Sequence, residues 1–266
     1  MEIDRKRTTS AVNGKFWGSA AVDWAAIQEK TCRPVYTAAF DRVGLKAGID
    51  YLDAGCGAGL AAQLAFERGA RVSGLDAAEN LLAIARERVP TGVFHVGELE
   101  CLPFPDGSFD LVTGFNSFQY AASPAGALAE AKRVARPGSH VVVMTWGTPE
   151  GMEAASLVGS LRPLLPPPPA GAPGPFALSD ETALRGFALA VALEPLEVFD
   201  VDSPWQYVDL TTALRGLRSS GVAARAIENS SAEAVDEAHA KVLTSFRQSD
   251  GSYRIGATFR CLVARA

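Results

Sequence analysis

An acidic residue and three glycines stand close together in Tyr51–Gly59, in the order Asp53, Gly55, Gly57 and Gly59. The stretch predicts an apolar strand that ends at the carboxylate and turns through the glycines into a helix. Because glycine has no Cβ, a ligand can lie almost on the peptide planes while the first helix amides point toward it. A carboxylate here would repel a pyrophosphate but suits an ammonium group. We therefore expect a ligand with an amino-acid-like cationic end.

A second acidic residue, Asp76, ends the predicted strand Arg71–Asp76. From this position a carboxylate can accept hydrogen bonds from both hydroxyls of a ribose. Asp76 alone does not separate a dinucleotide from another nucleoside, because both classes place an acid here. A third segment, 95–112, carries Glu98 and then Leu102-Pro103-Phe104-Pro105. The joint spacing of the three segments predicts a nucleoside-binding site.

Over residues 40–148 the chain resembles the class I S-adenosylmethionine-dependent methyltransferases, and within them the group that includes the ubiquinone/menaquinone-biosynthesis C-methyltransferases and many natural-product methyltransferases. The resemblance implies an α/β fold, a Rossmann-like doubly wound sheet of seven strands, mostly parallel with an antiparallel last strand. It implies S-adenosylmethionine as cofactor and S-adenosylhomocysteine as product. The implied partner is a small organic acceptor, methylated at O, N or C.

The same resemblance implies a role for individual residues. In such enzymes Asp is commoner than Glu at the place of Glu98, so this residue departs from the pattern. The implied cofactor residues are Asp53, Gly55, Cys56, Gly57 and Gly59 on the methionine side, Asp76 with Ala77 at the ribose, Glu98 and Leu99 at the adenine, and Phe115 and Asn116 near the methionine amine.

Two other classes of function stay open from the sequence. Gly57-x-Gly59-x-x-Ala62 also fits the looser dinucleotide pattern of an NAD(P)-dependent oxidoreductase, although Asp53 and the segment 102–112 favour a methyltransferase. A non-catalytic methyltransferase-like binding protein is the second alternative. For single residues a plainer interpretation also exists, since Glu98 could be a solvated loop carboxylate and Cys56 a small buried filler.

Composition indicates a cytoplasmic enzyme without membrane insertion. The chain has 266 residues, 48% of them hydrophobic, and a formal charge of −5 with no basic stripe, which disfavours nucleic acid as a partner. No stretch of 18 apolar residues occurs. The four cysteines are scattered, so neither a metal site nor a disulfide framework is indicated. We expect a monomer or a homodimer.

The periodicity predicts three parts: an N-terminal helical lid (1–39), the cofactor-binding core (40–148) and a C-terminal completion of the sheet (149–266). The last part contains a proline-rich loop (161–176) and a helical insertion (207–250) that covers the substrate. The predicted helices are 60–68, 79–88, one after Ser123 that runs to Val134, 179–191, 209–219, 222–228 and 232–246. The predicted later strands are 140–146, 196–201 and a closing strand 253–264.

Candidates for acceptor binding and catalysis come from aromatic and titratable residues near the expected cleft. Trp17 and Trp24 are seven residues apart, hence on one face of a predicted helix, which is either a lid or core packing. Tyr120 could orient the acceptor, and His239 is the candidate base in the insertion. The further substrate candidates are Gln119, Trp146, Trp205 and Tyr207.

Overall fold

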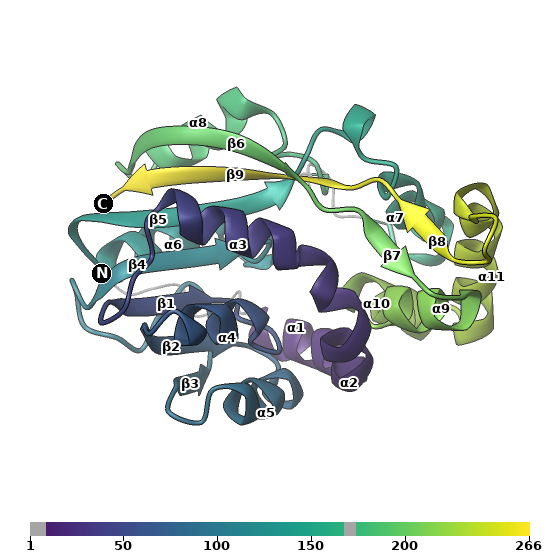
Figure 1. Cartoon of the computed structure of the whole chain (residues 1–266), viewed down its shortest axis with the longest axis horizontal. Coiled ribbons are helices and arrows are strands. Elements are labelled where there is room, and N and C mark those ends of the chain that lie inside the picture. Colours follow the sequence, from purple (N-terminus) through teal and green to yellow (C-terminus); the bar gives the residue numbers. More distant parts are fainter. Residues whose placement is uncertain (1–8, 168–173) are drawn as a thin grey trace.

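The computed structural model of the chain describes residues 9–167 and 174–266. A seven-stranded sheet forms its centre (Figure 1). Its strands are β1 (Asp50–Ala54), β2 (Arg71–Asp76), β3 (Val93–Val96), β4 (Phe109–Phe115), β5 (Ala135–Trp146), β6 (Glu194–Asp202) and β9 (Thr258–Arg265). They lie in the order β3-β2-β1-β4-β5-β9-β6, with β1 to β5 parallel and β9 antiparallel to both β5 and β6. The fold expected from the sequence is confirmed.

Helices cover both faces of this sheet. One face carries α3 (Arg33–Arg42), α4 (Leu60–Glu67) and α5 (Glu79–Arg88), and the other carries α6 (Pro124–Val134) and α8 (Glu181–Leu189). Side chains alternate along each strand, so Tyr51 faces the first layer and its neighbour Leu52 faces the second, both without solvent exposure. Such strands must be apolar on both faces, as the sequence of β5 indicates.

Local signals set the ends of the helices as predicted. The hydroxyl of Ser123 accepts a hydrogen bond from the amide of Gly126 at 3.1 Å and caps α6. Helix α4 ends at Glu67, and Gly69 follows with a φ of +85°, which favours glycine. The predicted bounds of α5 are confirmed.

The N-terminal segment is helical but not one helix. It consists of α1 (Ser10–Trp17), a 3₁₀ turn (Gly18–Ala20), α2 (Ala21–Asp23), a π-helical turn (Trp24–Gln28) and a second 3₁₀ turn (Glu29–Cys32). The prediction that Trp17 and Trp24 share one face of a regular helix is therefore wrong, because the backbone breaks at Ala20 (φ −136°, ψ 46°) and changes pitch. Their rings nevertheless meet edge to face, with centroids 5.0 Å apart.

The predicted closing strand 253–264 is two strands. β8 (Tyr253–Ile255) pairs with β7 (Trp205–Tyr207) in a separate ribbon, and only β9 joins the main sheet. Between them the amide of Gly256 donates to Glu153 at 2.6 Å. An alternating pattern identifies strands but not their partners, so the sequence did not reveal this division.

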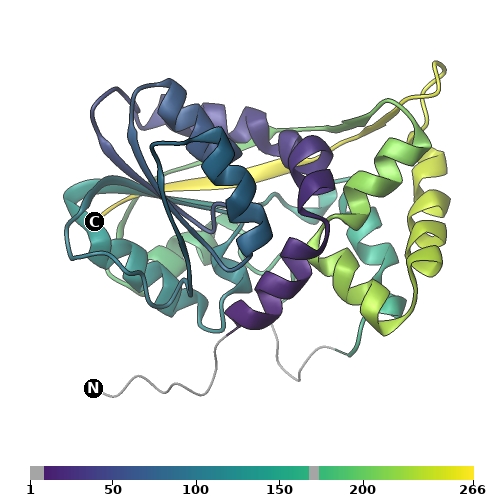
Figure 2. The ribbon, with the colours of Figure 1, turned by 90° about the horizontal axis from the view of Figure 1, so that it is seen from below.

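The insertion contains the three predicted helices, observed as α9 (Leu210–Arg218), α10 (Gly221–Asn229) and α11 (Ala232–Leu243), followed by the 3₁₀ turn Thr244–Phe246. With α7 (Ala155–Ser160) they gather at one end of the molecule, beyond the carboxyl ends of β4 and β5 (Figures 1 and 2). In the proline-rich loop Arg162–Leu164 forms a 3₁₀ turn, whereas Pro168, Pro169 and Pro173 lie outside the described residues. Across 9–167 and 174–266, no helix is long and apolar enough to cross a membrane.

Candidate cofactor site

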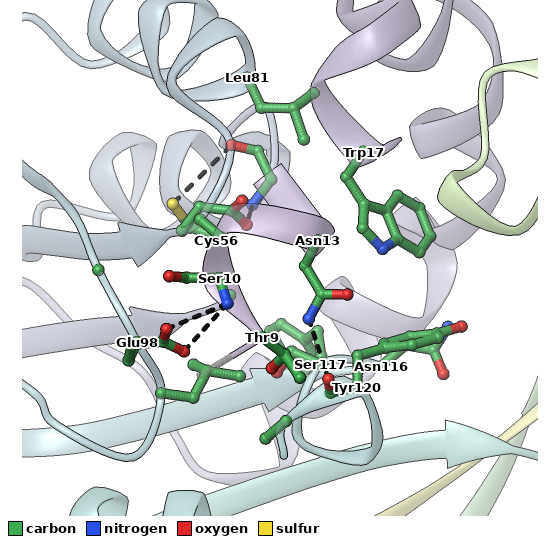
Figure 3. Close-up of a pocket in the computed structure, with 18 of the residues that line it drawn as sticks. Thr9, Ser10, Asn13, Trp17, Cys56, Leu81, Glu98, Asn116, Ser117 and Tyr120 are labelled. Atoms are coloured by element: carbon green, nitrogen blue, oxygen red, sulfur yellow. Dashed lines mark hydrogen bonds between the residues drawn. The ribbon is translucent and has the colours of Figure 1, made fainter. Parts of the chain in front are cut away.

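A cavity lies at the carboxyl ends of β1, β2 and β4, between the sheet and the N-terminal segment (Figure 3). Twelve of the residues predicted for the site line it: Trp17, Trp24, Gly55, Cys56, Gly57, Asp76, Ala77, Glu98, Leu99, Phe115, Asn116 and Tyr120. Residues from five separate segments of the chain therefore meet in one place. Lining residues that the sequence did not suggest include Ser10, Asn13, Glu29, Cys32, Tyr36 and Ser117.

The glycine loop follows β1 in the predicted manner. Gly55 has a φ of +81°, and a Cβ at this position would lie 2.4 Å from the Cβ of Ser117, so only glycine fits. The amides of Gly55 and Cys56 both donate to the carbonyl of Leu75, at 2.7 and 3.0 Å. These bonds tie the loop to the end of β2.

Asp76 holds the same loop. Its two carboxylate oxygens accept from the amides of Gly57 and Ala78, each at 2.9 Å, while the side chain still borders the cavity. Burial raises the pKa of Asp76, and the backbone donors oppose that rise. The residue predicted at the ribose is therefore present at the cavity and fixed in position.

Asp53 lies directly behind the loop rather than in the cavity wall and is 1% exposed. The hydroxyl of Thr113 donates to it at 3.1 Å, and Thr113 is itself hydrogen-bonded to the hydroxyl of Tyr51 at 2.7 Å. Burial, together with the nearby carboxylates of Glu29 and Asp76, raises the pKa of Asp53 to about 7, against the opposing effect of the hydrogen bond from Thr113. A cation close to these carboxylates would favour their ionised forms.

Glu29 brings a further carboxylate from the N-terminal segment. It is 3% exposed, accepts from the amide of Leu60 at 3.2 Å, and pairs with Arg88 at 2.5 Å. Burial raises its pKa, and Arg88 opposes the rise. Arg88 also donates to the carbonyls of Ala25 and Ala58, which fastens the N-terminal segment to the glycine loop.

At the opposite end of the cavity the first turn of α1 meets the residue predicted at the adenine. The amide of Ser10 donates to both carboxylate oxygens of Glu98, at 3.1 and 3.2 Å, and the side-chain amide of Asn13 donates to the carbonyl of Tyr120 at 2.9 Å (Figure 3). The N-terminal segment thus closes over the cavity.

Aromatic rings form the wall beside this cover. Trp17 lies edge to face with Tyr120, with centroids 5.4 Å apart, and Tyr36 packs on Phe115 at 4.6 Å. Burial is the main cause that raises the pKa of Tyr120 to about 12, and the interaction with Trp146 opposes this rise. At neutral pH this phenol is a hydrogen-bonding group and not a base.

The remaining predicted residues do not line the cavity. Gly59 is the left-handed residue before α4, and Gln119 donates to Asn116. Trp146 stacks on Phe259 and contacts Trp205, and the hydroxyl of Tyr207 donates to Gln28. His239 is 2% exposed within the insertion, where burial lowers its pKa to about 4. The roles predicted for Gln119, Trp146, Trp205, Tyr207 and His239 stay predictions, and the cavity wall does not support them.

A family model described as a methyltransferase domain matches residues 52–143. The chain carries a methyltransferase domain. The match begins in β1 and ends in β5, so it spans the glycine loop, Asp76, Glu98 and Asn116. The resemblance inferred from the sequence is confirmed over this stretch.

Curated relatives agree with the domain. The chain is 38% identical over 98 residues to a malonyl-acyl-carrier-protein O-methyltransferase of Serratia marcescens, covering 37% of this chain and 38% of the relative. It is 34% identical over 134 residues to a demethylmenaquinone methyltransferase of Tropheryma whipplei, covering 48% and 55%. The chain thus spans about two fifths to just over half the length of these relatives.

Solved structures share the fold at low identity. The cyclase SpnF matches with a TM-score of 0.63 at 19% identity, covering 97% of each chain. An N-methyltransferase of Haemonchus contortus, solved with phosphomonomethylethanolamine and S-adenosylhomocysteine, matches with a TM-score of 0.54 at 21% identity, covering 86% of this chain and 52% of that one. Because one neighbour is a cyclase, the fold alone does not fix the chemistry.

Proposed function

We propose that the protein is an S-adenosylmethionine-dependent methyltransferase of a small organic acceptor. The observation that carries this proposal is the position of Glu29 at the N-terminus of α4, where its carboxylate accepts the amide of Leu60. In dinucleotide-binding proteins this helix end receives the pyrophosphate. Here Glu29, which is paired with Arg88, already accepts from that helix amide, so a pyrophosphate would have to displace it.

A cofactor with a cationic amino-acid end suits the same surroundings. Asp53, Glu29 and Asp76 surround the glycine loop, and each pKa is raised by burial. An ammonium and a sulfonium both lower the electrostatic cost of ionising these acids. Asp76 and Glu98 border the cavity with acceptor oxygens, as a ribose and an exocyclic adenine amine require. The residues present therefore fit S-adenosylmethionine.

When bound, the cofactor would supply an activated methyl group for an in-line displacement. The residues of the site would contribute mainly by positioning the two reactants, which in well-oriented reactions lowers the activation barrier by roughly 7–11 kcal/mol. The aromatic wall of Trp17, Tyr120 and Phe115 would hold the acceptor and exclude water. The N-terminal segment would act as a lid that opens for exchange.

The charges of the wall narrow the class of acceptor. Among the described lining residues there are four carboxylic acids, Glu29, Asp76, Glu98 and Glu100, and no lysine or arginine. An anionic acceptor would find no counter-ion there, so we infer a neutral or cationic aromatic or amine acceptor.

Calorimetry with S-adenosylhomocysteine and with NADH tests the proposal. Binding of S-adenosylhomocysteine without a response to NADH is expected, and the opposite result would refute it. A screen of neutral, cationic and carboxylate acceptors with labelled S-adenosylmethionine, read by mass shift, then tests the acceptor class. Methylation confined to carboxylates would contradict the charge argument.

A further inference from the structure

The side chain of Trp24 carries an unused hydrogen-bond donor at the glycine loop. Its Nε1 atom is buried and has no hydrogen-bond partner, although Trp24 borders the cavity. An unpartnered buried donor is costly, and native structures keep few of them. Of the described lining residues, Trp24 is the one whose side-chain donor is both buried and unpartnered.

This donor points to a specific place above Gly57. A Cβ built on Gly57 would lie 3.5 Å from Nε1 of Trp24 and 3.6 Å from a carboxylate oxygen of Glu29. Because Gly57 has no side chain, the space between these two atoms is open to a ligand, and the φ of +54° favours glycine there. One side of this space offers an N–H and the other offers a carboxylate.

Those two groups match the two charged ends of an α-amino acid. An indole N–H only donates, so its partner must be an acceptor, and a carboxylate accepts the strongest hydrogen bonds. The surrounding acids, Glu29, Asp53 and Asp76, cannot serve a carboxylate, whereas they suit an ammonium group. A donor from outside the glycine loop is therefore needed for the anionic end.

We propose that the indole N–H of Trp24 binds the carboxylate of the amino-acid part of the cofactor, an inference that rests on the proposed function. The lid would then select the cofactor as well as cover it. A nucleoside without this carboxylate would bind without engaging Trp24, so the residue distinguishes S-adenosylmethionine from its decarboxylated form.

The test compares two ligands on three forms of the full chain. Calorimetry would measure S-adenosylhomocysteine and its decarboxylated analogue, 5′-S-(3-aminopropyl)-5′-thioadenosine, on wild type, Trp24→Phe and Trp205→Phe. Trp205 is the matched control, because its Nε1 is also buried and unpartnered but lies outside the cavity. Trp24→Phe should lower the affinity for S-adenosylhomocysteine about tenfold and change the affinity for the analogue less than about twofold. Trp205→Phe should alter neither.

An equal loss for both ligands in Trp24→Phe would overturn the inference, because it would show that the ring acts through packing. Failure of wild type to bind S-adenosylhomocysteine would instead overturn the proposed function and this inference with it. If circular dichroism shows that Trp24→Phe is unfolded, the indole N–H spectrum of ¹⁵N-labelled wild type decides. The Trp24 resonance should shift with S-adenosylhomocysteine and not with the analogue, and identical shifts would refute the inference.

Discussion

Ser10 and Glu98 are joined across 88 positions of sequence: the amide that begins α1 faces both oxygens of the carboxylate, at 3.1 and 3.2 Å. Glu98 is also the proposed acceptor for the adenine amine. A carboxylate has about four acceptor positions, so one residue can hold the lid and read the base. Under the proposed function, the position of the first helix and recognition of the cofactor would thereby be linked.

Glu98→Ala should both loosen the attachment of α1 and weaken cofactor binding. Loss of a charge-assisted hydrogen bond is worth roughly 1.5–3 kcal/mol, so the Kd of S-adenosylhomocysteine should rise about tenfold or more. Hydrogen exchange of residues 10–17 should be faster in the free variant. Glu98→Gln is the matched variant, since it keeps one acceptor oxygen and should lose less. If hydrogen exchange of residues 10–17 were unchanged in Glu98→Ala, Glu98 would not hold the N-terminal segment in place.

Asp76→Ala should lower the affinity for S-adenosylhomocysteine about 10- to 100-fold, because the ribose would lose a charged hydrogen-bond acceptor. The variant should also unfold at a lower temperature, since Asp76 accepts from Gly57 and Ala78. Asp106→Ala serves as the control, because that side chain is 81% exposed in a surface ion pair. A normal affinity in folded Asp76→Ala would remove Asp76 from the ribose site.

The stability of the free protein should depend on Asp53 between pH 4 and 8. Its pKa is about 7 in the folded state, against an ordinary value of 3.8, so the folded state holds a proton that the unfolded state has released. The contribution is complete below pH 4 and is lost as the pH rises through 7. From pH 5 to 7 wild type should lose roughly 2 kcal/mol relative to Asp53→Asn. Parallel urea-unfolding curves for the two proteins at all pH values would contradict this.

Gly57→Ala should affect binding more than folding. The new Cβ would lie between Trp24 and Glu29 without a contact closer than 3.5 Å, so the folding cost is that of a left-handed alanine, roughly 1–2 kcal/mol. Gly48→Ala is the matched control, because Gly48 has a φ of +86° and nothing within 4 Å of a built Cβ. Both variants should lose similar stability, but only Gly57→Ala should lose affinity for S-adenosylhomocysteine. If Gly57→Ala and Gly48→Ala bound S-adenosylhomocysteine equally well, the ligand would not occupy the space between Trp24 and Glu29.

The sequence predicted the residues whose chemistry depends on short spacing. The glycine loop, Asp76 and Glu98 follow consecutive strands, and parallel strands bring such positions to one edge of a sheet. Glu29 and Ser10 could not be found in this way, because their partners Arg88 and Glu98 are 59 and 88 positions away. Trp17 and Trp24 do line the cavity, but they do not share one regular helix, since helical periodicity assumes a constant pitch that Ala20 interrupts.

The short ribbon of β7 and β8 has an evolutionary consequence. Trp205 pairs with Ile255 and Tyr207 with Tyr253, so the chain leaves and re-enters the sheet region through adjacent strands. Residues 208–252 join the rest of the chain through these two strands, and their helices also contact the N-terminal segment, where Arg215 pairs with Asp23. A recombination between β7 and β8 would exchange that block of helices, while every strand of the main sheet would keep its register. Diversification of such a scaffold is therefore expected to proceed by replacement of this whole block, while the main sheet is inherited unchanged.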